Sequence, residues 1–284
     1  MINIEMTKIR SFAVIFFLLI TSYSRSQTIH GKLIDSVSKN PIGYVNIGII
    51  GKNVGTVSDD KGNFAIELKD QYDNDTLKFS MIGFKNLQFG IGNFKKEYLS
   101  NNESIQVKLE KSITVLKEVL IKPKKYVTKI IGNTTNSSSI VGGFTSNNLG
   151  SELGTVMKIK KSPAFIVNVN FNIAVNKYDS ITFRINIYKI KNRIPTENIL
   201  NEPLLITTKI KKGTLSIDVR KYNLIAEDDF FVSIEWIKDL KGSDLCFSGG
   251  FLNQDSFSRK TSQGSWRKVS TIGLGIYSTV TYEK

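Results

Sequence analysis

The chain has 284 residues, of which 40% are hydrophobic and 23% are charged, and it carries a formal net charge of +14. This composition supplies enough apolar material for packed cores and excludes an intrinsically disordered chain, and the length suits two ordinary domains or one large sandwich. Cys246 is the only cysteine, so an intramolecular disulfide is excluded, and the lysines are dispersed rather than gathered into the stripe typical of nucleic-acid binding.

Residues 1–26 have the pattern of a secretory signal peptide. Lys8 and Arg10 supply positive charge, and residues 12–20 form an uninterrupted apolar run that is too short to span a bilayer. The small residue Ser26 stands at a suitable cleavage position. The sequence therefore predicts an exported protein that is located in the periplasm, at the outer-membrane surface or outside the cell.

Residues 27–111 predict a small antiparallel β-sandwich. Short runs of alternating polarity recur with turn residues between them, so that each strand has one polar and one apolar face. Residues 59–63 separate two such runs and have the composition of a tight turn, in which Gly62 accepts a positive φ. No helical stretch is expected in this part. The seven candidate strands are residues 29–35, 44–50, 55–57, 63–68, 76–81, 84–90 and 105–109.

Residues 112–124 are expected to form a basic linker, and residues 125–284 a second, larger β-sandwich of jelly-roll type. In residues 132–151, 16 of the 20 residues are Gly, Asn, Ser or Thr, which is typical of a flexible linker or a long surface loop. Residues 165–175 then alternate asparagines with apolar side chains and predict a long, half-buried strand. About eight strands are expected in this half, and the fold class is all-β.

Most of the residues that hydrolytic chemistry needs are missing. His30 is the only histidine, which removes a Ser-His-Asp arrangement in the second half and a histidine zinc cluster. No glycine-rich phosphate loop leads into a helix pattern, and we expect neither a cofactor nor a metal. Two carboxylates alone can still hydrolyse a glycan. The candidate carboxylates are Glu152, Asp179, Glu227, Asp228, Asp229, Glu235 and Asp244.

Two tryptophans offer flat surfaces on which a sugar ring could stack. Trp236 is in phase with the apolar residues of its strand, so we expect it in the core. Trp266 lies in the polar segment 261–268 next to Arg267, and these two residues are the candidate ligand-binding pair. Packing of Trp266 at the edge of a sandwich is the alternative interpretation.

The first half resembles the carboxypeptidase-like regulatory domain. Residues 41–47 resemble the family's proline followed by a V-x-I strand, residues 55–64 its G-T-x-[TS]-D-x-x-G-x-F hairpin, and residues 82–84 a later I-G-[YF] motif. The resemblance covers about residues 27–109. It implies a seven-stranded Greek-key sandwich of the prealbumin type, found as an accessory module in carboxypeptidases and at the start of Bacteroidetes outer-membrane nutrient transporters. No zinc motif of a metallocarboxypeptidase accompanies it, so the resemblance implies a fold and an envelope location but no activity.

The sequence therefore favours a non-enzymatic protein of the cell envelope or cell surface that binds a glycan, a peptide or a partner surface protein. For an exported basic protein, anionic surfaces such as acidic polysaccharide or lipid head groups are the expected electrostatic partners, and nucleic acid is not. Two alternatives remain: a small outer-membrane β-barrel with a periplasmic module, and a carboxylate-dependent glycan hydrolase.

Overall fold

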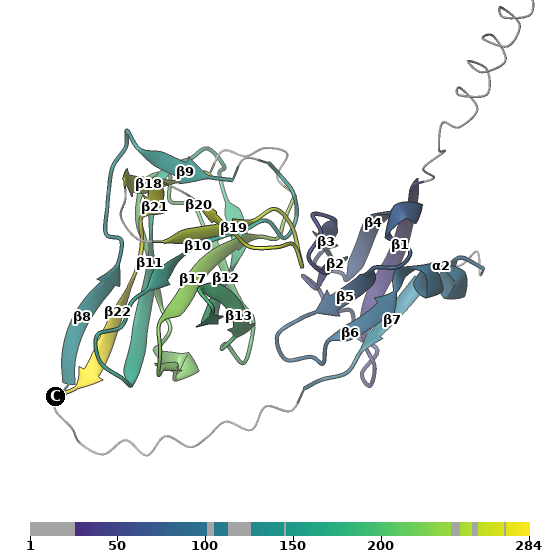
Figure 1. Ribbon diagram of the computed structural model, residues 1–284, viewed down its shortest axis with the longest axis horizontal. Helices are drawn as coiled ribbons and strands as arrows, with labels where there is room; N and C mark the ends of the chain where they lie inside the picture. The colour runs from purple at the N-terminus through teal and green to yellow at the C-terminus, as the bar shows by residue number, and fades with distance from the viewer. Residues whose placement is uncertain are drawn as a thin grey trace, which may run out of the picture.

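The computed structural model describes residues 26–100, 105–112, 126–144, 146–239, 245–251, 255–269 and 271–284. The predicted signal peptide and the predicted basic linker lie almost entirely outside these residues. The described chain is nearly all β, as predicted, and it forms two sandwiches that stand side by side (Figure 1). No helix among the described residues is long and apolar enough to cross a membrane.

The first sandwich has the seven predicted strands, arranged in sheets of order β4-β1-β7 and β3-β2-β5-β6. All pairs are antiparallel except β1 with β7, which is parallel. In β4, β5 and β7 every second side chain is buried. The bounds are β1 Ser26–Asp35, β2 Asn46–Ile49, β3 Gly55–Val57, β4 Asn63–Lys69, β5 Thr76–Ser80, β6 Leu87–Gly90 and β7 Ile105–Leu109.

The predicted turn at residues 59–63 is confirmed. Asp59 Oδ1 accepts hydrogen bonds from the backbone N–H groups of Lys61, at 2.9 Å, and Asn63, at 2.8 Å. Gly62 has a φ of +80°, and a Cβ there would stand 2.6 Å from the carbonyl oxygen of Leu33. Only glycine fits this position without strain.

The sequence did not predict α2 (Ile91–Leu99), which follows β6 and packs beside the short 3-10 turn η1 (Asp70–Tyr72) that lies between β4 and β5. Its N-cap is a glycine that makes no side-chain capping bond, so the usual start signal is missing. Tertiary packing forms the helix instead, because Ile91 and Phe94 are fully buried in the first core. Lys95 also binds the carboxylates of residues 70 and 73, at 2.9 and 2.6 Å.

The second sandwich contains fifteen described strands, more than the eight expected from sequence, because several are only two to five residues long. Seven form the front sheet, of order β13-β12-β17-β10-β19-β20 with β14 beside β12, and eight form the back sheet around β11 and β22. The bounds are β8 Tyr126–Gly132, β9 Val141–Gly143, β10 Glu152–Met157, β11 Ala164–Asn176, β12 Ile181–Lys191, β13 Ile194–Asn198, β14 Leu204–Thr208, β15 Gly213–Asp218, β16 Ile225–Ala226, β17 Phe230–Trp236, β18 Leu245–Phe251, β19 Ser256–Arg259, β20 Arg267–Val269, β21 Ile272–Leu274 and β22 Ile276–Glu283, with a 3-10 turn η2 at Arg220–Tyr222.

The two sheets of the second sandwich enclose one core, to which β12, β17, β11 and β22 all contribute. Trp236 is 1% exposed in this core, as predicted. The long strand β11 is also confirmed, but its asparagines are not on a wet face. Asn172 is 2% exposed and donates to the carbonyl oxygens of Thr134 and Thr135, so part of the polar stretch 132–151 covers the back sheet.

Candidate functional site

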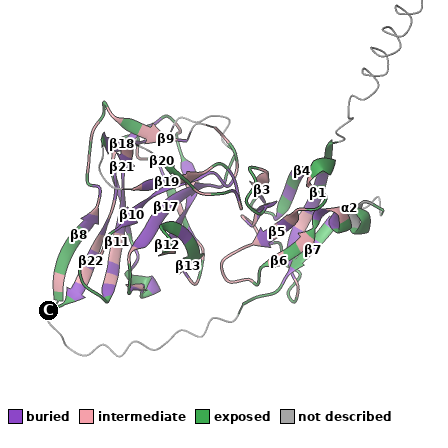
Figure 2. Ribbon diagram, in the orientation of Figure 1, coloured by how far each residue is buried: buried purple, intermediate pink, exposed green. Residues whose placement is uncertain are grey.

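The outer face of the front sheet carries charged residues, among them Arg184 and Glu235. Along β12, Phe183 and Ile185 point into the core, so alternation places Arg184 and Asn186 on the opposite face. That face is nevertheless buried (Figure 2): the first sandwich contacts Arg184, and Trp266 of the second sandwich itself packs on Tyr188 and Phe231. We call five polar side chains there, four buried and one mostly buried (Arg259), the interdomain charge cluster: Glu152, Arg184, Asn186, Glu235 and Arg259.

Two carboxylates form the centre of the cluster. Glu152 of β10 and Glu235 of β17 are directly opposite in the antiparallel register, and both are fully buried. The side-chain amide of Asn186 donates to both of them, at 2.9 Å to Glu152 Oε1 and 2.8 Å to Glu235 Oε2. Each carboxylate then has its own arginine: Arg184 Nε lies 2.8 Å from Glu235 Oε2, and Arg259 Nη2 lies 2.5 Å from Glu152 Oε2.

The two carboxylates differ in pKa. Burial raises the pKa of Glu152, and the neighbouring charge of Arg259 does not offset it. Burial also acts to raise the pKa of Glu235, but the charge and the hydrogen bond of Arg184 hold it below the ordinary value. A glycan hydrolase uses two carboxyl groups of different pKa, one as the acid and the other as base or nucleophile. Here, however, both groups are covered and bonded to arginines, so no substrate reaches them in this arrangement.

Arg184 joins the two sandwiches. Its Nη1 donates to the carbonyl oxygen of Tyr44 at 2.7 Å, and its Nη2 donates to Asn46 Oδ1 at 2.6 Å. Both acceptors belong to the first sandwich. Since Arg184 is 2% exposed and also binds Glu235, a single guanidinium connects the β2 region to the front sheet.

A loop of the second sandwich forms the other part of the interface. Residues 260–266 connect β19 to β20 and reach β2 and β3 of the first sandwich (Figure 1). The carbonyl oxygen of Ser262 lies where a Cβ on Gly48 or Gly55 would come within 2.3 and 2.5 Å of it, so both positions must be glycine. Gln263 Nε2 also donates to Ser80 Oγ at 2.8 Å.

A cavity of about 400 Å³ opens beside the cluster, between the two sandwiches, and its volume is in the range of small-molecule sites, about 300–1,000 Å³. We call it the interdomain cavity. Most of its lining is polar. The first sandwich contributes Asn46, Lys78, Ser80, Met81, Ile82, Gly83, Phe84, Asn86 and Ser112, and the second contributes Arg184, Asn186, Tyr188, Thr196, Glu197, Asn198, Leu200, Asn201, Arg259 and Gln263.

Two buried polar atoms of the cavity lining have no hydrogen-bond partner within the described chain. They are Nε of Arg259 and Oδ1 of Asn201. Lys78 lines the same cavity and makes no ion pair with a carboxylate of the described residues. Buried polar atoms are normally paired, so unpaired ones in a cavity mark places where a ligand or ordered water is expected.

The candidate ligand-binding residues from the sequence lie at the edge of this region. Trp266 is half-buried, and its ring packs edge-on against Phe231 at 5.2 Å and Tyr188 at 6.0 Å between ring centroids. The guanidinium of Arg259 covers the Trp266 ring at 4.8 Å. Arg267 is exposed in β20. Ligand binding by this pair stays a prediction, and the packing that was the alternative for Trp266 is present.

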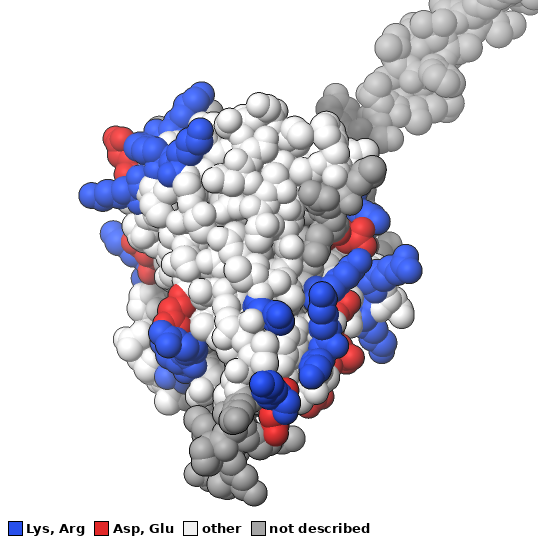
Figure 3. All heavy atoms as spheres, turned by 90° about the vertical axis from the view of Figure 1, so that its left-hand side faces the viewer, with Lys and Arg blue, Asp and Glu red and all other residues white. Residues whose placement is uncertain are grey.

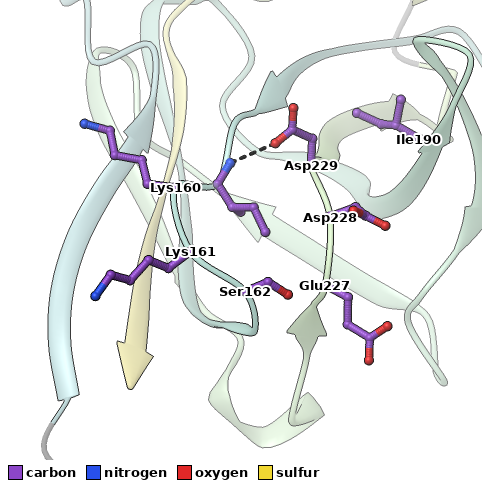
Figure 4. Close-up of a pocket in the computed structure, with 8 residues that line it drawn as sticks. Lys160, Lys161, Ser162, Ile190, Glu227, Asp228 and Asp229 are labelled. Carbon is purple, nitrogen blue, oxygen red and sulfur yellow. Dashed lines mark hydrogen bonds between the residues drawn. The ribbon is translucent and has the colours of Figure 1, made fainter. Parts of the chain in front are cut away.

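The remaining candidate carboxylates do not meet. Asp179 is exposed and pairs with Lys211, and Asp244 lies outside the described residues. The other three line a surface hollow of about 570 Å³ before β17, where Asp229 accepts a hydrogen bond from the backbone of Ile159 (Figure 4). The acidic side chains and the two lysines of this hollow point to opposite sides, so they do not converge on one ligand. The three carboxylates that line this hollow are Glu227, Asp228 and Asp229.

Sequence reasoning missed Arg184, Arg259, Asn186, Lys78 and Asn201. The first three lie in or beside strands of mixed polarity, which we interpreted as having one wet face. One signal was available: β17 reads Phe-Phe-Val-Ser-Ile-Glu-Trp and begins with two consecutive large apolar residues, which is typical of a strand covered on both faces. Glu235 in such a strand has to be paired.

A family model described as the CarboxypepD_reg-like domain matches residues 29–121. This part of the chain is thus similar to the CarboxypepD_reg-like domain. The match confirms the resemblance seen in the sequence, and the matched residues include the strands of the first sandwich after the start of β1. A CarboxypepD_reg-like domain is a non-catalytic domain of regulatory or binding type. In this chain the domain supplies about half of the lining of the interdomain cavity.

No curated protein matches the chain. Among solved structures, a chain from the crystal structure of the infectious bursal disease virus VP2 subviral particle is similar over 92% of this chain, at 10% identity and a TM-score of 0.25. This chain covers 56% of the length of that chain. At this TM-score the likeness indicates neither a shared fold nor a shared function for either sandwich.

Proposed function

We propose that this is a non-enzymatic, exported protein of the cell envelope that binds a glycan in the interdomain cavity. The observation that carries the proposal is the cavity itself. Both sandwiches line it, its walls are mainly amides, hydroxyls and charged groups, and two of its buried polar atoms are unpaired. Hydroxyl-rich ligands are recognised by such lining, because each ring hydroxyl both donates and accepts hydrogen bonds.

The interface supports a binding role because it keeps the cavity in one shape. Arg184 binds both sandwiches, and the loop at 260–266 fits against two glycines of the CarboxypepD_reg-like domain. A site that is formed before the ligand arrives loses less conformational entropy on binding. The two domains thus act together as one binding unit.

Among the ligands expected from the sequence, the cavity favours a glycan over a peptide or a partner protein. A peptide needs an exposed strand edge or an apolar groove, and a protein partner needs a surface larger than this cavity offers. The cavity has few apolar residues, chiefly Met81, Phe84 and Leu200. These can contact the apolar face of one sugar ring while the polar atoms hold its hydroxyls.

A glycan array followed by calorimetry tests this function. The mature chain from residue 27 is compared with Asn201→Leu, which removes an unpaired acceptor of the cavity, and with Asn93→Leu as a matched control on the exposed side of α2. We expect binding by the wild type and the control and roughly tenfold weaker binding by Asn201→Leu, the size of one or two lost hydrogen bonds. Absence of any glycan hit, or equal binding by all three proteins, overturns the proposal.

Cell fractionation tests the proposed location. We expect the mature protein in the periplasm, on the washable cell surface or in the culture medium. Recovery only in the cytoplasm, with residues 1–26 still attached, contradicts export.

A further inference from the structure

We infer that the interdomain cavity selects a ligand that carries a single negative charge on a hydroxylated framework, and that its ligand class is the acidic sugar, with a carboxylate placed between Lys78 and Arg259. This inference rests on the proposed function and names the class of glycan. It follows from which polar groups of the cavity are already paired and which are not.

The cationic groups of the cavity are not all neutralised by the protein. The charge of Arg184 is matched by Glu235, at 2.8 Å, and Arg259 pairs with Glu152, at 2.5 Å. Glu197, the only acidic residue in the lining, is exposed and is bonded to a surface lysine outside the cavity. Lys78 is left without a carboxylate partner among the described residues.

Lys78 is also in an unfavourable position when the cavity is empty. It is half-buried, and its pKa is lowered by burial and then by the positive charge of Arg259. Taking an unpaired cation partly out of water costs free energy, which a bound anion would offset. Lys78 therefore lies near a second cation, Arg259, in a cavity where no carboxylate of the described residues pairs with it.

Arg259 is held in an orientation suited to receive such an anion. One of its terminal nitrogens binds Glu152 and Tyr188, and its flat face lies on the ring of Trp266 at 4.8 Å. Its Nε is buried and has no partner. A guanidinium that is fixed on one edge and unpaired on another can donate to a carboxylate oxygen without losing further side-chain freedom.

The unpaired acceptor in the cavity indicates that the bound anion also carries hydroxyl groups. Asn201 Oδ1 is buried and can only accept a hydrogen bond, so a bare carboxylate does not satisfy it. A ligand hydroxyl does. Further hydroxyl and amide groups, on Ser80, Asn86 and Asn198, line the same space. A sugar acid provides both the charge and the hydroxyls, whereas a simple oxyanion provides only the charge.

The test compares three probes on the mature chain by calorimetry: D-galacturonate, neutral D-galactose and inorganic sulfate. The variants are Lys78→Met and, as a control of equal charge change, Lys108→Met on the exposed side of β7. We expect galacturonate to bind roughly tenfold to a hundredfold more tightly than galactose, the range of one charged hydrogen bond, and Lys78→Met to lose that difference. Lys108→Met should bind as the wild type does.

Each other outcome overturns the inference in a distinct way. Equal binding of galactose and galacturonate removes charge selection but leaves a glycan-binding cavity. Sulfate binding as tight as that of galacturonate shows a simple ion site and removes the sugar. If neither sugar binds while other neutral glycans bind and are lost in Asn201→Leu, the acidic class is wrong and the proposed function stands.

Discussion

Replacement of Arg184 by methionine is the sharpest test of how the two sandwiches are held together. Methionine keeps much of the length and the apolar stem but removes the guanidinium. The change deletes the hydrogen bonds to Tyr44 and Asn46 in the first sandwich and the ion pair to Glu235 in the second. Glu235 is then fully buried with Asn186 as its remaining hydrogen-bond donor, and its Oε1 is already unpaired.

The size of the effect follows from the buried charge that is left behind. Removing one partner of a buried ion pair costs about 3–5 kcal/mol, because the other charge remains desolvated. For a chain of this size that corresponds to a fall in Tm of roughly 6–20 °C. Making Glu235→Gln in the same protein removes the uncompensated charge, so the double variant should recover about 1–3 kcal/mol.

The difference in stability between the wild type and Arg184→Met should grow from acidic to neutral pH. In the wild type the pKa of Glu235 is held below its ordinary 4.5, so this group stabilises the fold above that pH and the contribution is lost in acid. Without Arg184, burial raises the pKa of Glu235 above 4.5 instead. The variant then has its largest deficit near neutral pH, and the deficit shrinks as the pH falls and Glu235 takes up a proton.

Urea unfolding of the mature chain at about pH 8 and about pH 5 measures these quantities, with tryptophan fluorescence as the probe. Trp236 and Trp266 both lie in the second sandwich and report on it directly. A loss of less than about 1 kcal/mol in Arg184→Met, the size of an exposed ion pair, refutes the buried linkage. So does a loss that is equal at the two pH values, or no recovery in the double variant.

Three further predictions concern the interface and the cavity. Gly48→Ala should lower the free energy of unfolding by about 1–3 kcal/mol and expand the particle in small-angle scattering, because its Cβ would meet the Ser262 carbonyl oxygen. Gly90→Ala should do neither, because its Cβ would make only an ordinary contact with Asn93 Nδ2 at 3.9 Å. Trp266→Ala should cost about 2 kcal/mol in urea unfolding, since a half-buried ring loses two aromatic contacts, and an unchanged midpoint contradicts packing. Lys78→Met should raise Tm at neutral pH, because it removes an unpaired cation from the cavity. The gain should vanish towards pH 10.5, where the lysine of the unfolded wild type also loses its proton, and a lower Tm at neutral pH contradicts this prediction.

The sequence predicted most of the first sandwich because its signals are local. Alternation of polarity specified seven strands, and the turn at residues 59–63 follows from the hydrogen bonds of one aspartate and the φ of one glycine. The resemblance to the CarboxypepD_reg-like domain is carried by the same turns and strands, and the family match agrees with it. Helix α2 was missed because packing of Ile91 and Phe94 forms it, without a capping residue to announce it.

The candidate site was not predictable in the same way, since it depends on contacts between residues far apart in the chain. Strand alternation gives Arg184, Asn186 and Glu235 a common face, and it says nothing of what covers that face. The same pattern describes a solvated sheet surface and a buried interface equally well. Trp266 likewise stood in a polar segment, while its neighbours Tyr188 and Phe231 came from strands elsewhere in the second half.

The sequence by itself thus determined the all-β class, the positions of the strands in the first half and the core location of Trp236, because hydrophobic period and turn chemistry act over a few residues. Only the tertiary structure decided that the outer face of the front sheet is dry, that Glu152 and Glu235 lie side by side, and that Lys78 and Arg259 face one cavity. These facts depend on strand pairing within the second sandwich and on contacts between the two sandwiches, such as the bonds of Arg184 to Tyr44 and Asn46, which join residues far apart along the chain.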